Sequence, residues 1–219
     1  MLLDLCTQEP GRGPVEPVQG AYLRVSNRAQ VRVAWVMSLV MSVPVASTPD
    51  PSGLPVPPPV DADAFRRAVG HFASGVTVVT ARLDGVDHAM TASAFTSVSL
   101  EPVLVLVCVD KEARFRDAVL ESGVWGVSVL SAGGRQAADW FATKGRPLVG
   151  QLDRFPHHRG RSTDVALLDG AVAWLEVRST AVYDGGDHDI VVGEVIDLAI
   201  GDRDASALVY HRGHYGHLP

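Results

Sequence analysis

The stretch AMTASAFTSVS, residues 89 to 99, sets five small hydroxyl-bearing side chains around one methionine and one phenylalanine. The five are Thr91, Ser93, Thr96, Ser97 and Ser99. Threonine is a good strand residue, and an edge strand with one polar face would show this alternation. A strand that offers hydroxyl groups to a polar ligand would show it too. The neighbouring segments must decide between these two interpretations.

The segments on both sides of this stretch predict strands joined by tight turns. VTVVTARL (residues 76–83) is a strand pattern, and the Asp84-Gly85 pair predicts a hairpin turn into a second strand that runs through residues 89–99. After Glu101-Pro102, VLVLVCVD (residues 103–110) is an apolar run of strand length. The sequence therefore places the hydroxyl-rich stretch inside a β-sheet.

Helices interrupt the strands at only a few places. Asp61 can cap a first helix with Phe65, Val69 and Phe72 at helical spacing, and EARFRDAVLESG (residues 112–123) predicts a second helix. VWGVSVL (residues 124–130) predicts another strand, and Ser131 is expected to cap a third helix, through AADWFATKG (residues 137–145). Residues 146 to 164 are expected to form an irregular loop.

From Val165 onward, the sequence predicts β structure again. Two long β-rich runs, residues 171–184 and 188–201, are joined by a Gly-Gly-Asp turn, and ALVYHRGHYGHL (residues 207–218) closes the chain. Because hairpins and short helices join successive strands, without regular crossover helices, we expect an antiparallel sheet closed into a barrel. The fold class is mainly β with short helices.

Composition limits the partners and the compartment. The 219 residues carry a formal net charge of -6, which argues against nucleic acid or an anionic membrane as the main partner, because both require clustered lysine and arginine. Cys6 lies in a polar stretch and Cys108 in an apolar run, so a disulfide framework is not expected. A cytoplasmic location fits.

Residues 1–60 differ in composition from the rest. AWVMSLVMSVPVA (residues 34–46) superficially resembles a signal-peptide core, but an alternative start of translation at Met37 or Met41 is the favoured interpretation. Residues 47–60 form a proline-rich segment that predicts an extended linker. We therefore expect an N-terminal extension over residues 1–60 and one domain over residues 61–219.

Several familiar chemistries find no support. No glycine-rich loop follows a strand and opens a helix, so a dinucleotide-binding α/β domain is not expected, and there is no nucleophile elbow. His211, His214 and His217 invite a metal site, but their spacing matches no standard ligand pattern, and no metal is predicted. Asp187 and its two following neighbours could also be metal ligands, but aspartate is common in turns because its side chain forms hydrogen bonds with the backbone.

Three separated segments together resemble one family. AMTASAFTSVSLEPVLVLVCVD, DGAVAWLEVRSTAVYDGGDHDIVVGEV and YHRGHY are similar, in order and spacing, to the flavin reductase-like proteins, short-chain NAD(P)H:flavin oxidoreductases that serve two-component monooxygenases. The resemblance covers residues 62–218. It implies an FMN-binding split β-barrel with Greek-key topology, which dimerises and holds FMN or FAD in a groove near the subunit interface.

The resemblance also implies which residues contact the flavin. A flat ring system tolerates only small neighbours and needs hydrogen-bonding groups around its polar edge, which suits the hydroxyl-rich stretch. The family pattern carries a flavin contact onto Thr91, Ala92, Ser93, Ala94, Ser97, Val98 and Ser99.

Further contacts are implied after the apolar strand and in the last turn. Lys111 and Arg114 match the segment that meets the flavin phosphate, although relatives carry serine or threonine where this chain has Ala113 and Phe115. Phe141 matches an aromatic residue close to the flavin. His188, in the Gly-Asp-His turn, is implied to lie where the nicotinamide stacks on the flavin.

The function implied is reduction of FMN, or FAD, by hydride from NADH or NADPH, with reduced flavin supplied to a monooxygenase. A flavin carrier or sensor on the same barrel is one alternative. A flavoenzyme that acts directly on an organic substrate is another, and a metal-binding module built on the C-terminal histidines is a third.

Overall fold

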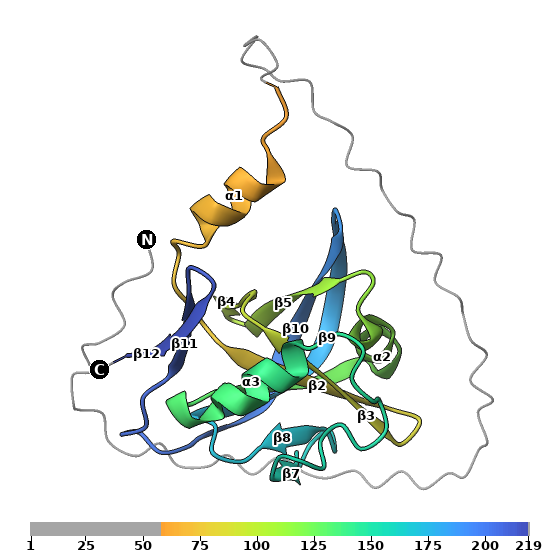
Figure 1. The fold of residues 1–219 in the computed structure, drawn as a ribbon. Coiled ribbons are helices and arrows are strands. Elements are labelled where there is room, and N and C mark those ends of the chain that lie inside the picture. Colours follow the sequence, from red (N-terminus) through yellow and green to blue (C-terminus); the bar gives the residue numbers. More distant parts are fainter. Residues whose placement is uncertain (1–57, 219) are drawn as a thin grey trace, which may run out of the picture. The chain divides into compact units, whose positions relative to one another are not determined.

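The computed structural model describes residues 58–218. Its centre is an antiparallel sheet of seven strands in the order β3-β2-β6-β9-β10-β5-β4 (Figure 1). The mainly-β, antiparallel fold class is confirmed. The seven strands are β2 (Thr77–Leu83), β3 (Val86–Ala92), β4 (Phe95–Leu100), β5 (Val103–Asp110), β6 (Val124–Val129), β9 (Ala173–Gly185) and β10 (His188–Ile200).

The hydroxyl-rich stretch closes this sheet on itself. β3 and β4 are the two end strands of the sheet, yet only Ser93 and Ala94 separate them along the chain. The sheet must therefore curl until its two edges approach each other. The prediction of one strand through residues 89–99 is wrong, because the chain breaks at Ser93 to pass from one edge of the sheet to the other.

The predicted hairpins are present. Asp84 and Gly85 both have positive φ, as a two-residue hairpin turn requires, and β2 pairs with β3. Gly186, with φ 80°, turns β9 into β10. Both turns were predicted because glycine follows or precedes aspartate between two strand patterns.

The first core lies between the curled sheet and one helix. Alternate side chains of β5, including Val107 and Val109, are fully buried together with Trp125 of β6. Helix α2 (Arg114–Ser122) adds Phe115, and Gly123 ends it in the left-handed conformation as predicted. The helix begins at Arg114, and before it the Asp110 side chain accepts a hydrogen bond from the Glu112 N–H.

A second core lies under helix α3 (Arg135–Ala142), which crosses β2 and β3 in Figure 1. A single 3-10 turn, η1 (Ala132–Gly134), precedes α3. Ser131 does not cap the helix with its side chain, contrary to the prediction, because its hydroxyl donates a hydrogen bond to the Gly170 carbonyl oxygen.

Two smaller sheets complete the domain. β7 (His157–Arg159) lies inside the segment that was predicted to be irregular, residues 146–164, and pairs with β8 (Ala166–Leu168), which follows that segment. The three polar residues of β7 are too few to predict a strand from the sequence. β1 (Ser74–Gly75), β11 (Leu208–His211) and β12 (His214–His217) form a three-stranded sheet.

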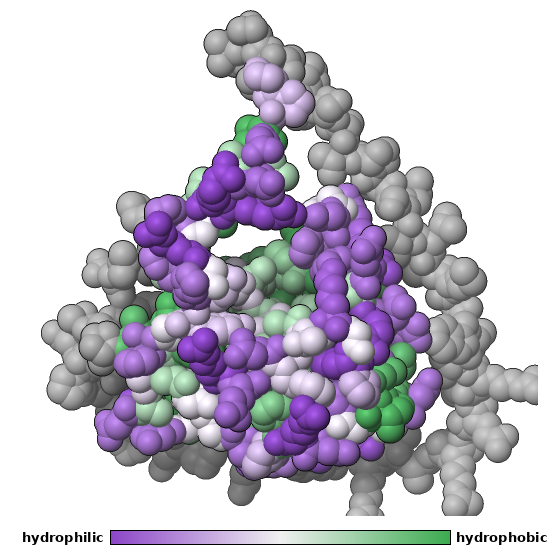
Figure 2. Space-filling view, viewed as in Figure 1, coloured by the Kyte–Doolittle hydropathy of each residue, from purple (hydrophilic) through white to green (hydrophobic). Residues whose placement is uncertain are grey.

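Helix α1 (Ala62–Val69) is capped by the Asp61 carboxylate as predicted. None of its residues is buried, and Phe65 and Val69, with Phe72 beyond the helix, are exposed. Figure 2 shows apolar surface in the opening beneath this helix.

Some predictions concern residues 1–57, which lie outside the described part of the chain. They are the signal-like segment, the alternative start, most of the proline-rich linker and the context of Cys6. Within residues 58–218, no helix is both long and apolar enough to cross a membrane.

Candidate functional site

A cavity of about 570 Å³ opens where three segments meet. β3 contributes residues 88–91, the connection from β5 into α2 contributes residues 110 and 112–115, and the end of α3 with its following loop contributes residues 141–146, 148 and 151. These segments are remote in sequence and are brought together by the packing of α2 and α3 on β3. The volume is in the range of small-molecule sites.

Arg146 is the cation most enclosed by this site. Its guanidinium donates hydrogen bonds to the carbonyl oxygens of Ala89 and Thr143 and to the side-chain oxygen of Gln151, and it lies 5.6 Å from the centre of the Phe141 ring. All of these partners are neutral. Burial, and secondly the charge of Arg114, lower the pKa of Arg146 from its usual value.

Arg114 lies beside Arg146 and donates a hydrogen bond of 2.7 Å to the Arg146 carbonyl oxygen. Among residues 58–218, no carboxylate lies within ion-pair distance of either guanidinium. Lys144, by contrast, pairs with Asp110 at 3.9 Å. Two neighbouring guanidiniums without a counter-charge make the cavity suited to an anion.

His88 adds an unsatisfied polar atom to the same cavity. Its Nδ1 is buried and has no hydrogen-bond partner in the described structure. Burial is the main cause that lowers the pKa of His88 below its usual value. A buried ring nitrogen without a partner is costly, and this atom is closed to solvent even though other atoms of His88 line the cavity.

Three of the predicted site residues line this cavity: Thr91, Arg114 and Phe141. The Thr91 hydroxyl donates a hydrogen bond of 2.7 Å to the Ala138 carbonyl oxygen in α3. Phe141 is buried and packs against Phe155 with ring centres 5.3 Å apart. Both side chains therefore support the walls of the cavity, and Arg114 contributes charge.

The other predicted residues of the hydroxyl-rich stretch lie outside the cavity. Ser93, Ala94, Ser97 and Val98 are exposed, and a register shift between β4 and β5 at residues 97–99 leaves Val98 without a paired residue. Half-buried Ser99 accepts a hydrogen bond from the Glu101 N–H, and Ala92 is buried in the first core. Small, exposed side chains thus surround the break between the two edges of the sheet.

His188 begins β10, directly after the turn. In the sheet it pairs with Asp110, the last residue of β5, which also lines the cavity. The Nδ1 atom of His188 lies 2.7 Å from a carboxylate oxygen of Asp187, and this contact lowers the pKa of Asp187 from its usual value. The His188 side chain is 42% exposed and can meet a ligand next to the cavity.

Lys111 is not among the residues that line the cavity. Its ammonium group donates hydrogen bonds to the Asp184 carboxylate and to the Gly186 carbonyl oxygen at 2.7 Å. The two cations that were assigned together to a phosphate therefore lie in different surroundings.

Sequence reasoning missed His88, Arg146 and Gln151. Arg146 lies in a segment expected to be irregular, and its partner Ala89 is 57 residues away. The only available signal was a basic pair at the end of the predicted third helix, Lys144 inside it and Arg146 directly after it.

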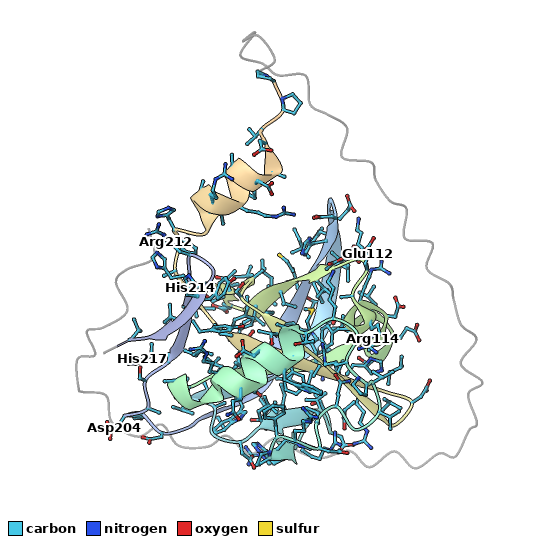
Figure 3. All side chains as sticks on the ribbon, viewed as in Figure 1. Glu112, Arg114, Asp204, Arg212, His214 and His217 are labelled. Atoms are coloured by element: carbon cyan, nitrogen blue, oxygen red, sulfur yellow. The ribbon has the colours of Figure 1, made fainter. Side chains whose placement is uncertain are left out.

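The C-terminal histidines lie far from the cavity. Figure 3 shows His214 and His217 on β12 at the opposite side of the view from Arg114 and Glu112. Within the described residues, no three histidine, cysteine, aspartate or glutamate side chains are grouped as metal ligands.

A family model described as the flavin reductase like domain matches residues 69–219. The chain belongs to this family. The predicted resemblance is thus confirmed, and the family model includes β2 to β12 and the whole cavity.

Named relatives agree with the family. An NADH-dependent FAD reductase of Streptomyces globisporus is 45% identical over 63% of this chain and 76% of its own length. The reductase component of a 4-hydroxyphenylacetate 3-monooxygenase of Thermus thermophilus is 38% identical over 69% of this chain and 94% of its own length.

Solved structures agree as well. The flavin reductase component of a bacterial two-component tryptophan halogenase is 45% identical, has a TM-score of 0.69, and covers 73% of this chain and 99% of its own. An NADH:FAD oxidoreductase of Streptomyces globisporus, solved with NAD and FAD fragments, is 37% identical with a TM-score of 0.70, over 76% of this chain and 98% of its own.

The residues of the flavin reductase-like domain fit a flavin nucleotide. Arg114 and Arg146 have no carboxylate partner among residues 58–218 and provide positive charge for an anion. The small exposed side chains at Ser93 and Ala94 leave room for a flat ring outside the cavity. The donor set suits a phosphorylated ligand with an extended ring better than an uncharged one.

Proposed function

We propose that the protein is an NADH-dependent flavin reductase that supplies reduced FMN or FAD to a separate monooxygenase. The observation that carries this proposal is the pair of guanidiniums in the cavity, Arg114 and Arg146, which have no carboxylate partner among residues 58–218. His188 lies next to this cavity, because it pairs in the sheet with Asp110, which lines it. The names of the relatives, reductases and reductase components of two-component enzymes, support the reaction class.

The residues of this chain bind and orient the two nucleotides. A bound flavin supplies the hydride acceptor, and NADH supplies the hydride. Arg114 and Arg146 would hold the phosphate of a bound flavin in the cavity, and the small side chains of Ser93 and Ala94 would leave room for its flat ring. His188 borders the place where the nicotinamide stacks. No proton needs to be moved by a strong acid or base, so alignment is the main contribution of the protein.

The hydroxyl-rich stretch contributes to flavin binding in two ways. Ser93, Ala94, Ser97, Val98 and Ser99 present small side chains and backbone groups to the ring. Thr91 and Ala92 contribute from within the fold, because the Thr91 hydroxyl already binds Ala138 and the Ala92 side chain is buried.

A second copy of the chain covers exposed apolar residues of β4, β5 and α1. Val98, Leu100 and Val103 on β4 and β5 are 46%, 66% and 44% exposed, and α1 exposes Phe65 and Val69. Apolar side chains in such number favour a homodimer, in which the partner shields the flavin ring from water. The domain formed by residues 61–219 is sufficient for this assembly. A cytoplasmic location fits a domain whose Cys108 is a free thiol.

The test is NADH oxidation by the purified protein with FMN, FAD or riboflavin added in turn. We expect oxidation that requires added flavin, and His188→Ala should raise the KM for NADH while the KM for flavin stays the same. Flavin that binds tightly without NADH oxidation would favour a carrier or sensor. Oxidation that requires a further organic substrate would favour a flavoenzyme acting on that substrate directly.

A further inference from the structure

The turn that carries His188 is held from outside by one side chain. β9 and β10 are joined by Gly186 and Asp187 alone, and Gly186 has φ 80°. A two-residue hairpin at the end of two long strands extends beyond much of the sheet, and its outermost residues have few neighbours. Anything that fixes this turn also fixes the position of the His188 ring.

Lys111 contacts the turn at three points. Its ammonium group bonds to the Asp184 carboxylate on the incoming strand and, at 2.7 Å, to the Gly186 carbonyl oxygen. Its backbone N–H donates a hydrogen bond of 3.0 Å to the Asp187 carbonyl oxygen. Lys111 therefore binds both sides of the turn. His188, proposed to border the nicotinamide, follows this turn directly.

In these contacts the positive charge of Lys111 is paired with the Asp184 carboxylate. Arg114, three residues later, lines the cavity and has no carboxylate partner among the described residues, whereas Lys111 lies outside the cavity and is paired. The lowered pKa of Asp184, caused first by the hydrogen bond from Lys111, agrees with a persistent pair.

We propose that Lys111 is a positioning residue that fixes the β9–β10 turn, and through it His188, and that it does not bind the flavin phosphate. The inference rests on the role proposed above for His188. Because the Lys111 side chain is 36% exposed and that of Asp184 is 71% exposed, the pair adds little to global stability. Its effect is local: it restricts the turn, and so it changes nicotinamide use.

The experiment compares Lys111→Met with Lys111→Arg in the full-length protein. We expect Lys111→Met to raise the KM for NADH about three- to tenfold, as loss of a charge-assisted contact would, with the KM for FMN within about twofold. Lys111→Arg keeps the charge and should restore most of the loss. Arg161→Met is the matched control, because the Arg161 side chain is 81% exposed and pairs with Asp197 in another part of the domain; it should change neither constant.

Two results would overturn the inference through kinetics. A higher KM for FMN in Lys111→Met, with the KM for riboflavin unchanged, would make Lys111 a phosphate ligand. A full additional loss when Lys111→Met is combined with His188→Ala would show that Lys111 does not act through His188. We expect the double variant to differ from His188→Ala by less than about twofold.

Hydrogen exchange separates failure of this inference from failure of the role of His188. Lys111→Met and Asp184→Asn should each speed amide exchange in residues 183–190 and should not add to one another. If His188→Ala leaves the KM for NADH unchanged, the proposed role of His188 is wrong, and faster exchange in Lys111→Met would still establish the restraint on the turn. Unchanged exchange would overturn that restraint whatever the kinetics show.

Discussion

The cavity and the β9–β10 turn are neighbours that balance their charges in opposite ways. In the turn, each basic side chain has a carboxylate beside it: Lys111 pairs with Asp184, and the His188 ring contacts Asp187. In the cavity, Arg114 and Arg146 lie side by side, and their hydrogen bonds go to neutral acceptors. The basic groups of the turn have carboxylate partners without a ligand, whereas Arg114 and Arg146 have none among the described residues and would gain one when an anion binds.

Because of this difference, the cavity is suited to bind an anion, and the turn is suited to position a side chain beside it. A phosphate that enters the cavity gains attraction without first breaking an ion pair, so its binding is not opposed by lost contacts. The turn gains nothing from an anion, but its internal pairs keep a polar side chain in place. Asp110 connects the two regions, since it pairs with His188 in the sheet and lines the cavity.

The largest effect should come from a substitution that lowers the stability of the domain, and so disrupts both the cavity and the β9–β10 turn. A Cβ atom at Gly193 would contact Val177 and lie 2.8 Å from the Arg178 carbonyl oxygen. Gly193→Val should therefore force β10 away from β9 and lower the free energy of unfolding by about 3 kcal/mol. Urea denaturation measures the loss. Gly216→Ala is the control, because nothing lies within 4 Å of its added Cβ atom; equal stability of the two variants would contradict the expected clash.

Removal of one unpaired cation should affect the cavity alone. Arg114→Met should raise the KM for FMN about tenfold or more and leave the KM for riboflavin, which lacks the phosphate, within about twofold. Steady-state NADH oxidation with each flavin measures both constants. An equal rise for the two flavins would show that Arg114 shapes the cavity without binding phosphate. The KM for NADH should change less than in His188→Ala.

Two hydroxyl groups of the opening stretch sharpen the comparison further. Thr91→Val removes the hydrogen bond to Ala138 and should lower the free energy of unfolding by about 1 kcal/mol with little change in the KM for FMN. Ser93→Ala changes an exposed side chain, so it should leave the free energy of unfolding nearly unchanged and raise the KM for FMN a few-fold. Urea denaturation measures the free energy of unfolding of both variants, and steady-state NADH oxidation measures their KM for FMN. Identical behaviour would mean that these hydroxyls do not divide into supporting and binding groups.

The sequence predicted what depends on local pattern or on family motifs. The Asp84-Gly85 turn, the α2 stop at Gly123 and the strand at residues 103–110 follow from neighbours in the chain. The Gly-Asp-His turn followed from the family motif. The structure supplies a physical reason for Gly193 in the same motif, namely the close approach of β9.

What the sequence did not predict depends on contacts between remote segments. Lys111 meets Asp184 across 73 residues, so its charge could not be assigned from the residues around it. Arg146 enters the cavity only because the loop after α3 folds back on β3. The break at Ser93 arises from closure of the sheet, which no local pattern records.

The smallest effect should appear in the pH dependence of stability. Burial lowers the pKa of His88 in the folded protein, so the unfolded chain binds the proton more readily. The free energy of unfolding should therefore fall as the pH drops through 6.5 and stop changing on this account below the lowered pKa of the folded state. His88→Gln should reduce this slope when urea denaturation is compared at pH 7.5 and 5.5.

Phosphate binding connects this slope with the cavity. An anion beside His88 would stabilise its protonated form, so inorganic phosphate at tens of millimolar should also reduce the slope in the wild-type protein and have little effect in His88→Gln. A slope that is the same in both proteins, with and without phosphate, would show that the proton is taken up elsewhere. It would also remove His88 from the set of groups that make the cavity respond to an anion while the turn does not.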